Sequence, residues 1–264
     1  MIKNAGSLPK GKITTLTTLI AAVAMLAAFP AASSAAKKKC TITGTSRSET
    51  LTGTSKADVI CGLGGNDRIK GLGGNDTIYG GDGADNIDGG TGNDVIDGEG
   101  GNDTEVGGDG ADVINGGSGA DSEDGGSGND HIEGDDGTDT ERGGLGNDTV
   151  LGEGEADTVS GGAGNDTVSG GAGNDVVRGD DGDDTMDGGE GDDDMDGGNG
   201  SDDEDGGDGN DSIHESGRST DVNKIKGGAG SNTYRDRNGH THSDEGDSVG
   251  HTDHGGDGWE GEDD

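Results

Sequence analysis

The sequence predicts an all-β fold, a right-handed parallel β-roll in which two nine-residue units make one coil of 18 residues. Three observations predict it. Aspartate recurs every nine residues at 18 positions without a slip, a glycine stands five residues before each of them, and an Ile, Val or Met stands two residues after most of them. A period kept over so many units is typical of a stacked solenoid and argues against a simple disordered linker. The aspartates are Asp58, Asp67, Asp76, Asp85, Asp94, Asp103, Asp112, Asp121, Asp130, Asp139, Asp148, Asp157, Asp166, Asp175, Asp184, Asp193, Asp202 and Asp211.

Each unit is expected to fold as a turn of about six residues and a strand of about three, with one side chain pointing into the core. The glycines permit positive φ and let neighbouring turns approach closely. Alternate units fall on two facing sheets, so the inward side chains form two ladders. One ladder is Ile60, Ile78, Ile96, Ile114, Ile132, Val150, Val168, Met186 and Glu204. The other is Ile69, Ile87, Glu105, Glu123, Glu141, Val159, Val177, Met195 and Ile213.

The repeat divides the chain into five segments. Outside the roll, Glu49 takes the aspartate position in the N-terminal cap, and Asn223 and Asn232 take it after the phase slips by three residues. We expect a signal peptide at 1–36, an N-terminal cap at 37–52, the roll at 53–214, degenerate cap repeats at 215–235 and a flexible, acidic, histidine-containing tail at 236–264.

The first segment has the features of a secretion signal. Lys3, Lys10 and Lys12 form a basic start, an apolar run extends from Leu19 to Phe29, and small residues follow up to Ala36. The apolar run is too short to span a bilayer core of about 30 Å. We therefore expect a secreted, extracellular protein with no membrane span in the mature chain.

The mature chain has two cysteines, Cys40 and Cys61. An exported protein meets oxidising conditions, which favours a disulfide between them over two free thiols. If the cap continued the roll, Thr43 and not Cys40 would stack over Cys61. A disulfide is therefore expected to require that the cap fold back across the first coil.

The charge of the chain indicates cationic partners. Its formal net charge is −40, which argues against nucleic acid and anionic membranes as partners. The stacked aspartates would repel one another, and a hard cation between successive turns would collect their carboxylates and backbone carbonyls. This ligand set is typical of calcium, fits the stricter geometry of magnesium less well, and lacks the His and Cys that transition metals prefer. The sequence has no catalytic motif, so we expect no enzyme activity.

These units resemble the RTX, or haemolysin-type, calcium-binding repeats, whose nonapeptide is Gly-Gly-x-Gly-x-Asp-x-(Leu/Ile/Val)-x. The likeness covers 53–214 and is greatest to the short secreted members that consist of little except the roll. It implies calcium between each unit and the second unit after it, with the 18 aspartates as side-chain ligands and at most about 16 ions. Lys56 and Glu155 replace turn glycines, so we expect altered sites beside them.

Four units carry glutamate at the inward position. Three of them, Glu105, Glu123 and Glu141, fall on consecutive strands of one sheet, and we call each such strand with its turn a rung. Burying an unpaired carboxylate is costly. The sequence therefore favours a locally loosened or outward-turned strand there, and makes 100–145 the least stable segment. An internal cation site is the alternative.

Two functional classes remain open. The favoured one is a secreted calcium-binding protein whose folding calcium drives, with a structural or cell-surface role. The alternative is a calcium-dependent adhesin or matrix component that displays a face to an unidentified cell-surface or matrix partner. The tail histidines His240, His242, His251 and His254 have spacings that could bind zinc or copper, but a flexible, solvated tail with incidental histidines is the favoured interpretation.

Overall fold

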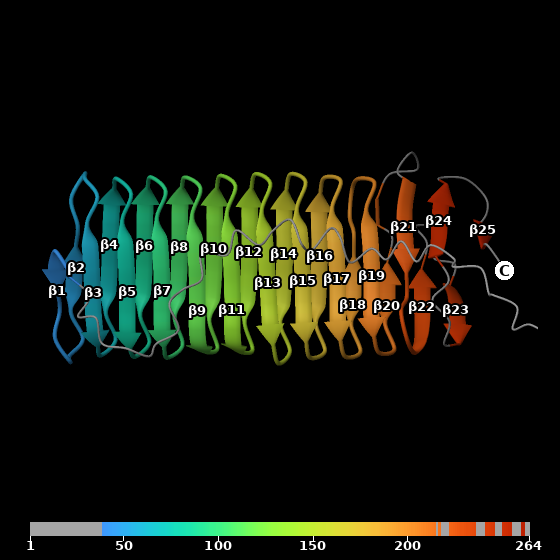
Figure 1. Cartoon of the computed structure of the whole chain (residues 1–264), viewed down its shortest axis with the longest axis horizontal. Coiled ribbons are helices and arrows are strands. Elements are labelled where there is room, and N and C mark those ends of the chain that lie inside the picture. The colour runs from blue at the N-terminus through green and yellow to red at the C-terminus, as the bar shows by residue number, and fades with distance from the viewer. Residues whose placement is uncertain are drawn as a thin grey trace, which may run out of the picture. The chain divides into compact units, whose positions relative to one another are not determined.

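The computed structural model describes residues 39–214, 216–217, 222–235, 241–245, 250–254 and 260–261, and the expected signal peptide lies outside them. The described part of the chain from residue 39 onward is an all-β parallel roll. Its strands alternate between two facing sheets, and the colour in Figure 1 advances along the stack from coil to coil. Among the described residues there is no helix long and apolar enough to cross a membrane.

The first sheet has 13 strands. In their order across the sheet they are β1 (Ile42–Thr43), β3 (Val59–Gly64), β5 (Thr77–Asp82), β7 (Val95–Gly100), β9 (Val113–Gly119), β11 (His131–Gly137), β13 (Thr149–Gly154), β15 (Thr167–Ala172), β17 (Thr185–Glu190), β19 (Asp203–Asp208), β21 (Val222–Lys226), β24 (Gly250–His254) and β25 (Glu260–Gly261).

The second sheet has 12 strands. In the same sense they are β2 (Thr50–Thr52), β4 (Arg68–Gly73), β6 (Asn86–Thr91), β8 (Thr104–Asp109), β10 (Ser122–Ser127), β12 (Thr140–Leu145), β14 (Thr158–Ala163), β16 (Val176–Asp181), β18 (Asp194–Asp196), β20 (Ser212–His214), β22 (Ser231–Arg235) and β23 (Thr241–Glu245).

The strand register confirms the 18-residue coil. Ile60 pairs with Ile78 in the first sheet, and Ile69 pairs with Ile87 in the second. Both inward ladders continue in this way through the roll, as the sequence predicts. Most strands have six residues and not the expected three, because pairing continues into the glycines after the inward residue, as where Leu63 lies opposite Gly81.

The core is the narrow space between the two ladders. Its aliphatic side chains are buried, and Ile42 and Leu51 extend the two ladders towards the N-terminus. Ile225 and Tyr234 extend them towards the C-terminus. Each coil therefore contributes only two core side chains, so apolar burial alone stabilises such a stack weakly.

The end of the stack differs from the repeats before it. β21 and β22 still pair in parallel, but β23 and β24 pair antiparallel with them, and β25 pairs antiparallel with β24. The sequence analysis predicts no regular element after residue 235, so these three strands were not expected. The hypothesis about the tail histidines falls outside what the structure describes, which omits His240 and the side chains of the other three.

Candidate metal centres

The repeated aspartates form two ladders, one along each edge of the roll, because every aspartate directly precedes a strand. From Asp76 onward its Oδ1 accepts a hydrogen bond from the backbone N–H of the aspartate one coil earlier, and Asp67 Oδ1 accepts from Glu49 N in the same way. Asp184 Oδ1 accepts from Asp166 N at 2.8 Å, and Asp166 Oδ1 accepts from Asp148 N at 2.8 Å. Each carboxylate therefore lies between two successive coils of the same edge, where the resemblance to the RTX repeats expected it.

The second carboxylate oxygen of these residues has a different environment. From Asp67 onward all of the repeated aspartates are buried, with side chains at most 4 % exposed. In sixteen of them Oδ2 is buried without any hydrogen-bond partner among the described residues. Buried acceptors in native proteins nearly always have a partner, so an array of this kind fits the binding of cations. The sixteen are Asp67, Asp76, Asp85, Asp94, Asp103, Asp112, Asp121, Asp130, Asp139, Asp148, Asp157, Asp166, Asp175, Asp184, Asp193 and Asp211.

The glycine five residues before each aspartate explains how a second ligand type reaches the same place. A Cβ added to Gly71 would lie 2.4 Å from Asp76 Oδ2 and 2.4 Å from the carbonyl oxygen of Gly89, in the next coil. Any side chain there would displace these oxygens. The glycine thus leaves a carboxylate oxygen and a carbonyl oxygen close together at the boundary between two coils, and both are hard ligands that suit calcium.

The electrostatics of the two ladders also require a cation. Burial raises the pKa of Asp184 to about 7, and the charges of Asp166 and Asp202 above and below it add to the rise. Burial and the neighbouring Asp130 and Asp94 likewise raise the pKa of Asp112 to about 7. The backbone N–H that each Oδ1 accepts opposes the shift without cancelling it. Without a cation, the edges therefore resist carrying full negative charge.

The first aspartate of the series does not share this geometry. Asp58 is only partly buried, and its Oδ2 accepts hydrogen bonds from the backbone N–H and the hydroxyl of Thr54, both at 2.8 Å. Its Oδ1 accepts from the Thr41 hydroxyl at 3.3 Å. The Thr54 hydroxyl is the main cause of the lowered pKa of Asp58. Protein donors thus satisfy both oxygens in the unit where Lys56 replaces a turn glycine.

The unit that contains Glu155 keeps the geometry of its neighbours. Glu155 adopts a left-handed conformation with φ of +70°, whereas most glycines at the same position of the other turns have φ between +96° and +154°. Asp157 remains buried, and its Oδ1 accepts from Asp139 N at 2.8 Å. The substitution costs backbone strain but leaves the position of the carboxylate unchanged.

Asparagine ends both ladders. Asn223 Oδ1 accepts the backbone N–H of Asp202, and Asn232 Oδ1 accepts that of Asp211, both at 2.9 Å. The sequence predicted that these residues take the aspartate positions, and the structure confirms it. Each amide oxygen performs the hydrogen-bonding role of a carboxylate Oδ1 and adds no charge.

The three consecutive glutamates point into the core, so the preference for a loosened or outward-turned strand is wrong. Glu105, Glu123 and Glu141 are at most 2 % exposed. Their strands β8, β10 and β12 pair in continuous register with each other and with β6 and β14. The backbone ladder holds these positions inward whatever side chain they carry. The sequence placed the three residues correctly on one ladder but favoured the wrong orientation for their side chains.

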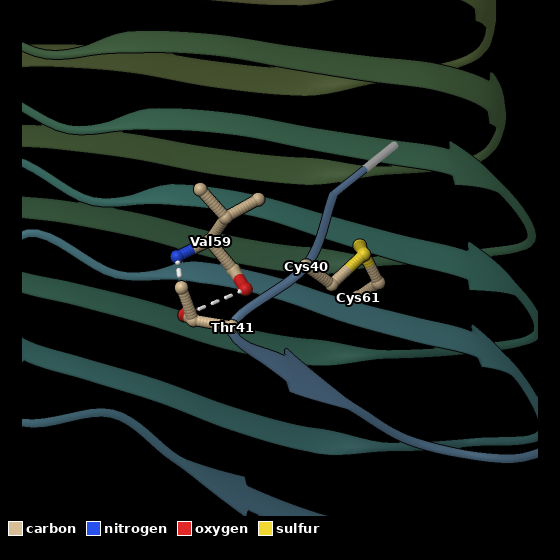
Figure 2. The surroundings of a disulfide bond; sticks show 4 residues. All are labelled: Cys40, Thr41, Val59 and Cys61. Atoms are coloured by element: carbon tan, nitrogen blue, oxygen red, sulfur yellow. Dashed lines mark hydrogen bonds between the residues drawn. A yellow bond between two sulfur atoms is a disulfide. The ribbon is translucent and has the colours of Figure 1, made fainter. Parts of the chain in front are cut away.

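Cys40 and Cys61 form a disulfide at the N-terminal end of the roll (Figure 2). β1 continues the roll, since Thr43 pairs with Cys61 as the 18-residue period requires. Cys40 lies before β1, and the chain there turns across β3, so that the sulfur atoms meet although the cap keeps its register. Thr41 fixes this turn, because its hydroxyl accepts from Val59 N at 2.8 Å and donates to Val59 O at 3.0 Å.

Comparison with known proteins gives the family. The family model described as the RTX calcium-binding nonapeptide repeat matches residues 43–78, 70–105, 106–141, 124–150, 142–177 and 169–204. Together these matches cover more than half of the chain and coincide with the coils described above. No curated protein matches the chain. The turn geometry and this match lead to one conclusion: the chain belongs to the RTX calcium-binding nonapeptide repeat family.

Proposed function

We propose that this is a secreted protein in which calcium, bound between stacked turns, drives the folding of the roll outside the cell. The observation that carries the proposal is the set of sixteen buried Oδ2 atoms without a hydrogen-bond partner among the described residues. Most of them lie close to the carbonyl oxygen of a glycine in the next coil, and calcium is the ion that this oxygen set suits.

Calcium would supply the stabilisation that the narrow core does not provide. Each coil buries two side chains, while its two edges bring buried carboxylates together. A cation at each boundary offsets the repulsion and links two coils, so the free energy of binding becomes free energy of folding. The ligands proposed for it are the repeated aspartates from Asp67 to Asp211, with Asp58 as the exception described above.

Secretion is proposed on two features. The basic and apolar segment at 1–36 has the composition of a signal peptide, and the Cys40–Cys61 disulfide suits an oxidising compartment. Extracellular calcium modules bind in the range of about 0.1–1 mM, so a roll of this kind folds where calcium is plentiful. We propose a structural or cell-surface role for the folded roll.

The test is a calcium titration of the purified mature chain, followed by far-UV circular dichroism and by counting the bound ions. We expect little β signal in excess chelator and a cooperative gain as calcium is added. A roll that keeps its full β signal in chelator, or that binds no calcium, would overturn the proposal.

A single-site variant sharpens the test. Asp166→Asn keeps an oxygen to accept Asp148 N but replaces the charged Oδ2 by an amide nitrogen. We expect weaker calcium binding and faster amide exchange on the edge that holds Asp148 and Asp184, with the opposite edge at Asp175 retained. Asp109→Asn, which removes an exposed carboxylate, is the matched control and should leave both edges unchanged.

A further inference from the structure

The glutamates of the second ladder are carboxylates without a protein partner. Both carboxylate oxygens of Glu105, Glu123 and Glu141 are buried and accept no hydrogen bond from any described residue. A protein that buries a carboxylate provides donors, a counter-charge or a metal ion for it. Here the described surroundings provide no side-chain donor and no counter-charge. The backbone N–H groups of Glu123 and Glu141 offset only part of the effect of burial, and the nearest charged groups are other carboxylates.

One of these glutamates lies within coordination range of two aspartates. Single carboxylate oxygens of Asp139, Glu141 and Asp157 all lie within 4.8 Å of one another, and all three residues are buried. Asp139 and Asp157 belong to consecutive coils of one edge. Two oxygens bound to the same calcium ion at about 2.3–2.6 Å are at most about 5 Å apart, so one ion can bind all three.

The glycine at this boundary shows the same convergence from the backbone side. A Cβ added to Gly134 would lie 2.5 Å from Glu141 Oε1, 3.0 Å from Asp139 Oδ2 and 3.1 Å from the carbonyl oxygen of Gly152. A core carboxylate, an edge carboxylate and a backbone carbonyl thus each place an oxygen close to the Cα of Gly134. The side chain of Glu141 reaches from the core to the edge to complete this group.

The two preceding rungs repeat the convergence at the glycine, while the close approach of a second aspartate is, among the described residues, particular to the group at Glu141. Around Gly116 the added Cβ would meet Glu123 Oε1 at 2.3 Å, the Gly134 carbonyl oxygen at 3.0 Å and Asp121 Oδ2 at 3.1 Å. Gly98 has the corresponding oxygens of Gly116, Asp103 and Glu105 at 2.5–2.7 Å.

An ordinary rung shows what the glutamate replaces. At Gly80 the neighbours of the added Cβ are Asp85 Oδ2 at 2.7 Å, the Gly98 carbonyl oxygen at 2.8 Å and the Cδ1 methyl of Ile87 at 3.2 Å. The carboxylate and the carbonyl are therefore common to both kinds of rung. In the glutamate rungs a charged oxygen takes the place of a methyl group.

From this geometry we propose that Glu105, Glu123 and Glu141 are calcium ligands that reach the edge from the core. Each supplies a third carboxylate to an ion held between the aspartate of its own coil and that of the next. The pairs are Asp103 with Asp121, Asp121 with Asp139, and Asp139 with Asp157. The inference rests on the proposed function for these aspartates and adds to it three sites of higher negative charge, which bind calcium more tightly than the two-aspartate sites.

The test compares neutral isosteres at two sets of positions. The triple variant E105Q/E123Q/E141Q keeps the side-chain volume and removes the three charges. E99Q/E153Q/E190Q is the charge control, because these three glutamates are exposed.

We expect the inward triple variant to bind fewer calcium ions and to need severalfold more calcium to reach half of its β signal. The charge control should match the unmodified protein. Europium excitation spectra provide a second readout, since the transition energy depends on the charge of the ligands. A component present in the unmodified protein and in the charge control should disappear in the triple variant.

Protonation is the competing explanation, and the same variants exclude or establish it. A protonated glutamate is mimicked by glutamine, so an unchanged ion count and an unchanged calcium midpoint in the triple variant would overturn the inference. A triple Glu→Ile variant that melts at a higher temperature with its full ion count would overturn it equally. If the inward triple variant does not fold, the single variant E141Q is measured by the same criteria. Failure of the unmodified protein to bind calcium would instead refute the proposed function itself.

Discussion

The glutamate rungs, at Glu105, Glu123 and Glu141, and the valine rungs, at Val159 and Val177, are neighbours in one sheet with opposite interiors. Glu141 pairs with Val159, and the register continues unchanged across this boundary. The aspartate ladder also continues, with Asp139 N donating to Asp157 Oδ1 at 2.8 Å. The comparison teaches that the turns and the backbone ladder set the geometry of a coil, while the inward side chain decides what stabilises it.

Calcium withdrawal should separate the two regions most strongly. The valine rungs keep apolar burial when calcium is lost, whereas the glutamate rungs keep only unpaired carboxylates. We expect less residual amide protection in Thr104–Leu145 than in Thr149–Glu190 once calcium is fully removed. Hydrogen exchange with mass spectrometry in excess chelator measures this. Greater residual protection in Thr104–Leu145 would contradict it.

A glutamate placed in a valine rung should reproduce the behaviour of the other region. Val177 lies two residues after Asp175 in the same kind of unit, so Val177→Glu adds a third carboxylate near the boundary of Asp175 and Asp193. We expect a clearly lower melting temperature at limiting calcium and substantial recovery at saturating calcium. Val177→Ala is the control, with a loss of about 2 kcal/mol that varies little with calcium. Equal destabilisation by Val177→Glu at both calcium levels would count against the comparison.

Acid should stabilise the metal-free roll, and more so in the glutamate rungs. Burial is the main cause that raises the pKa of Glu123 to about 9 and that of Glu141 to about 10. Because these values lie above roughly 4.3, the value for glutamate in an unfolded chain, the folded state binds more protons and its stability falls as pH rises. We expect the β signal in chelator to increase as pH is lowered from about 9 to about 5.

The pH dependence should change when the glutamates are removed. In the valine region burial raises the pKa of Asp166 only to about 6 and that of Asp184 to about 7. The triple variant E105Q/E123Q/E141Q should therefore lose the alkaline part of the pH dependence and keep the part near neutrality. A metal-free β signal that rises with pH would show that the sign is wrong.

Relief of strain in an outer turn should have the smallest effect. Glu153, in the last part of β13, has φ of +74°. Partial burial raises its pKa, and the charges of Glu133 and Asp135 add to the rise. Glu153→Gly removes both the strain and the repulsion, so we expect a gain of about 1 kcal/mol. Thermal unfolding at saturating calcium measures it. A variant that melts at a lower temperature would show that the left-handed conformation carries no cost here.

Much of this architecture follows from the sequence, because the nine-residue period determines which position of the repeat each residue occupies. The phase placed every inward residue on the correct ladder, and it placed Asn223 and Asn232 at the ends of the edges. The orientation of Glu141 did not follow, since the cost of burying a carboxylate favoured an outward turn while the pairing of β12 holds it inward.

The position of Cys40 was also hard to derive. Spacing alone sets Thr43 over Cys61, and only the local turn at Thr41 shows that Cys40 reaches the same residue. The distinct environment of Asp58 depends in the same way on a single nearby side chain, Thr54, and not on the repeat. The repeat pattern describes what the units share, so a feature confined to one unit cannot be predicted from it.

The aspartate hydrogen bonds give the stack a polarity. In every coil the acceptor for an aspartate N–H comes from the coil that follows it, as Asp166 accepts from Asp148. Removing coils from the amino end therefore uncovers no aspartate N–H group, whereas removing them from the carboxyl end uncovers one aspartate N–H on each edge. A chain that emerges with its amino end first can complete each coil only after its successor has emerged. Asn223 and Asn232 provide the last acceptors and close the series.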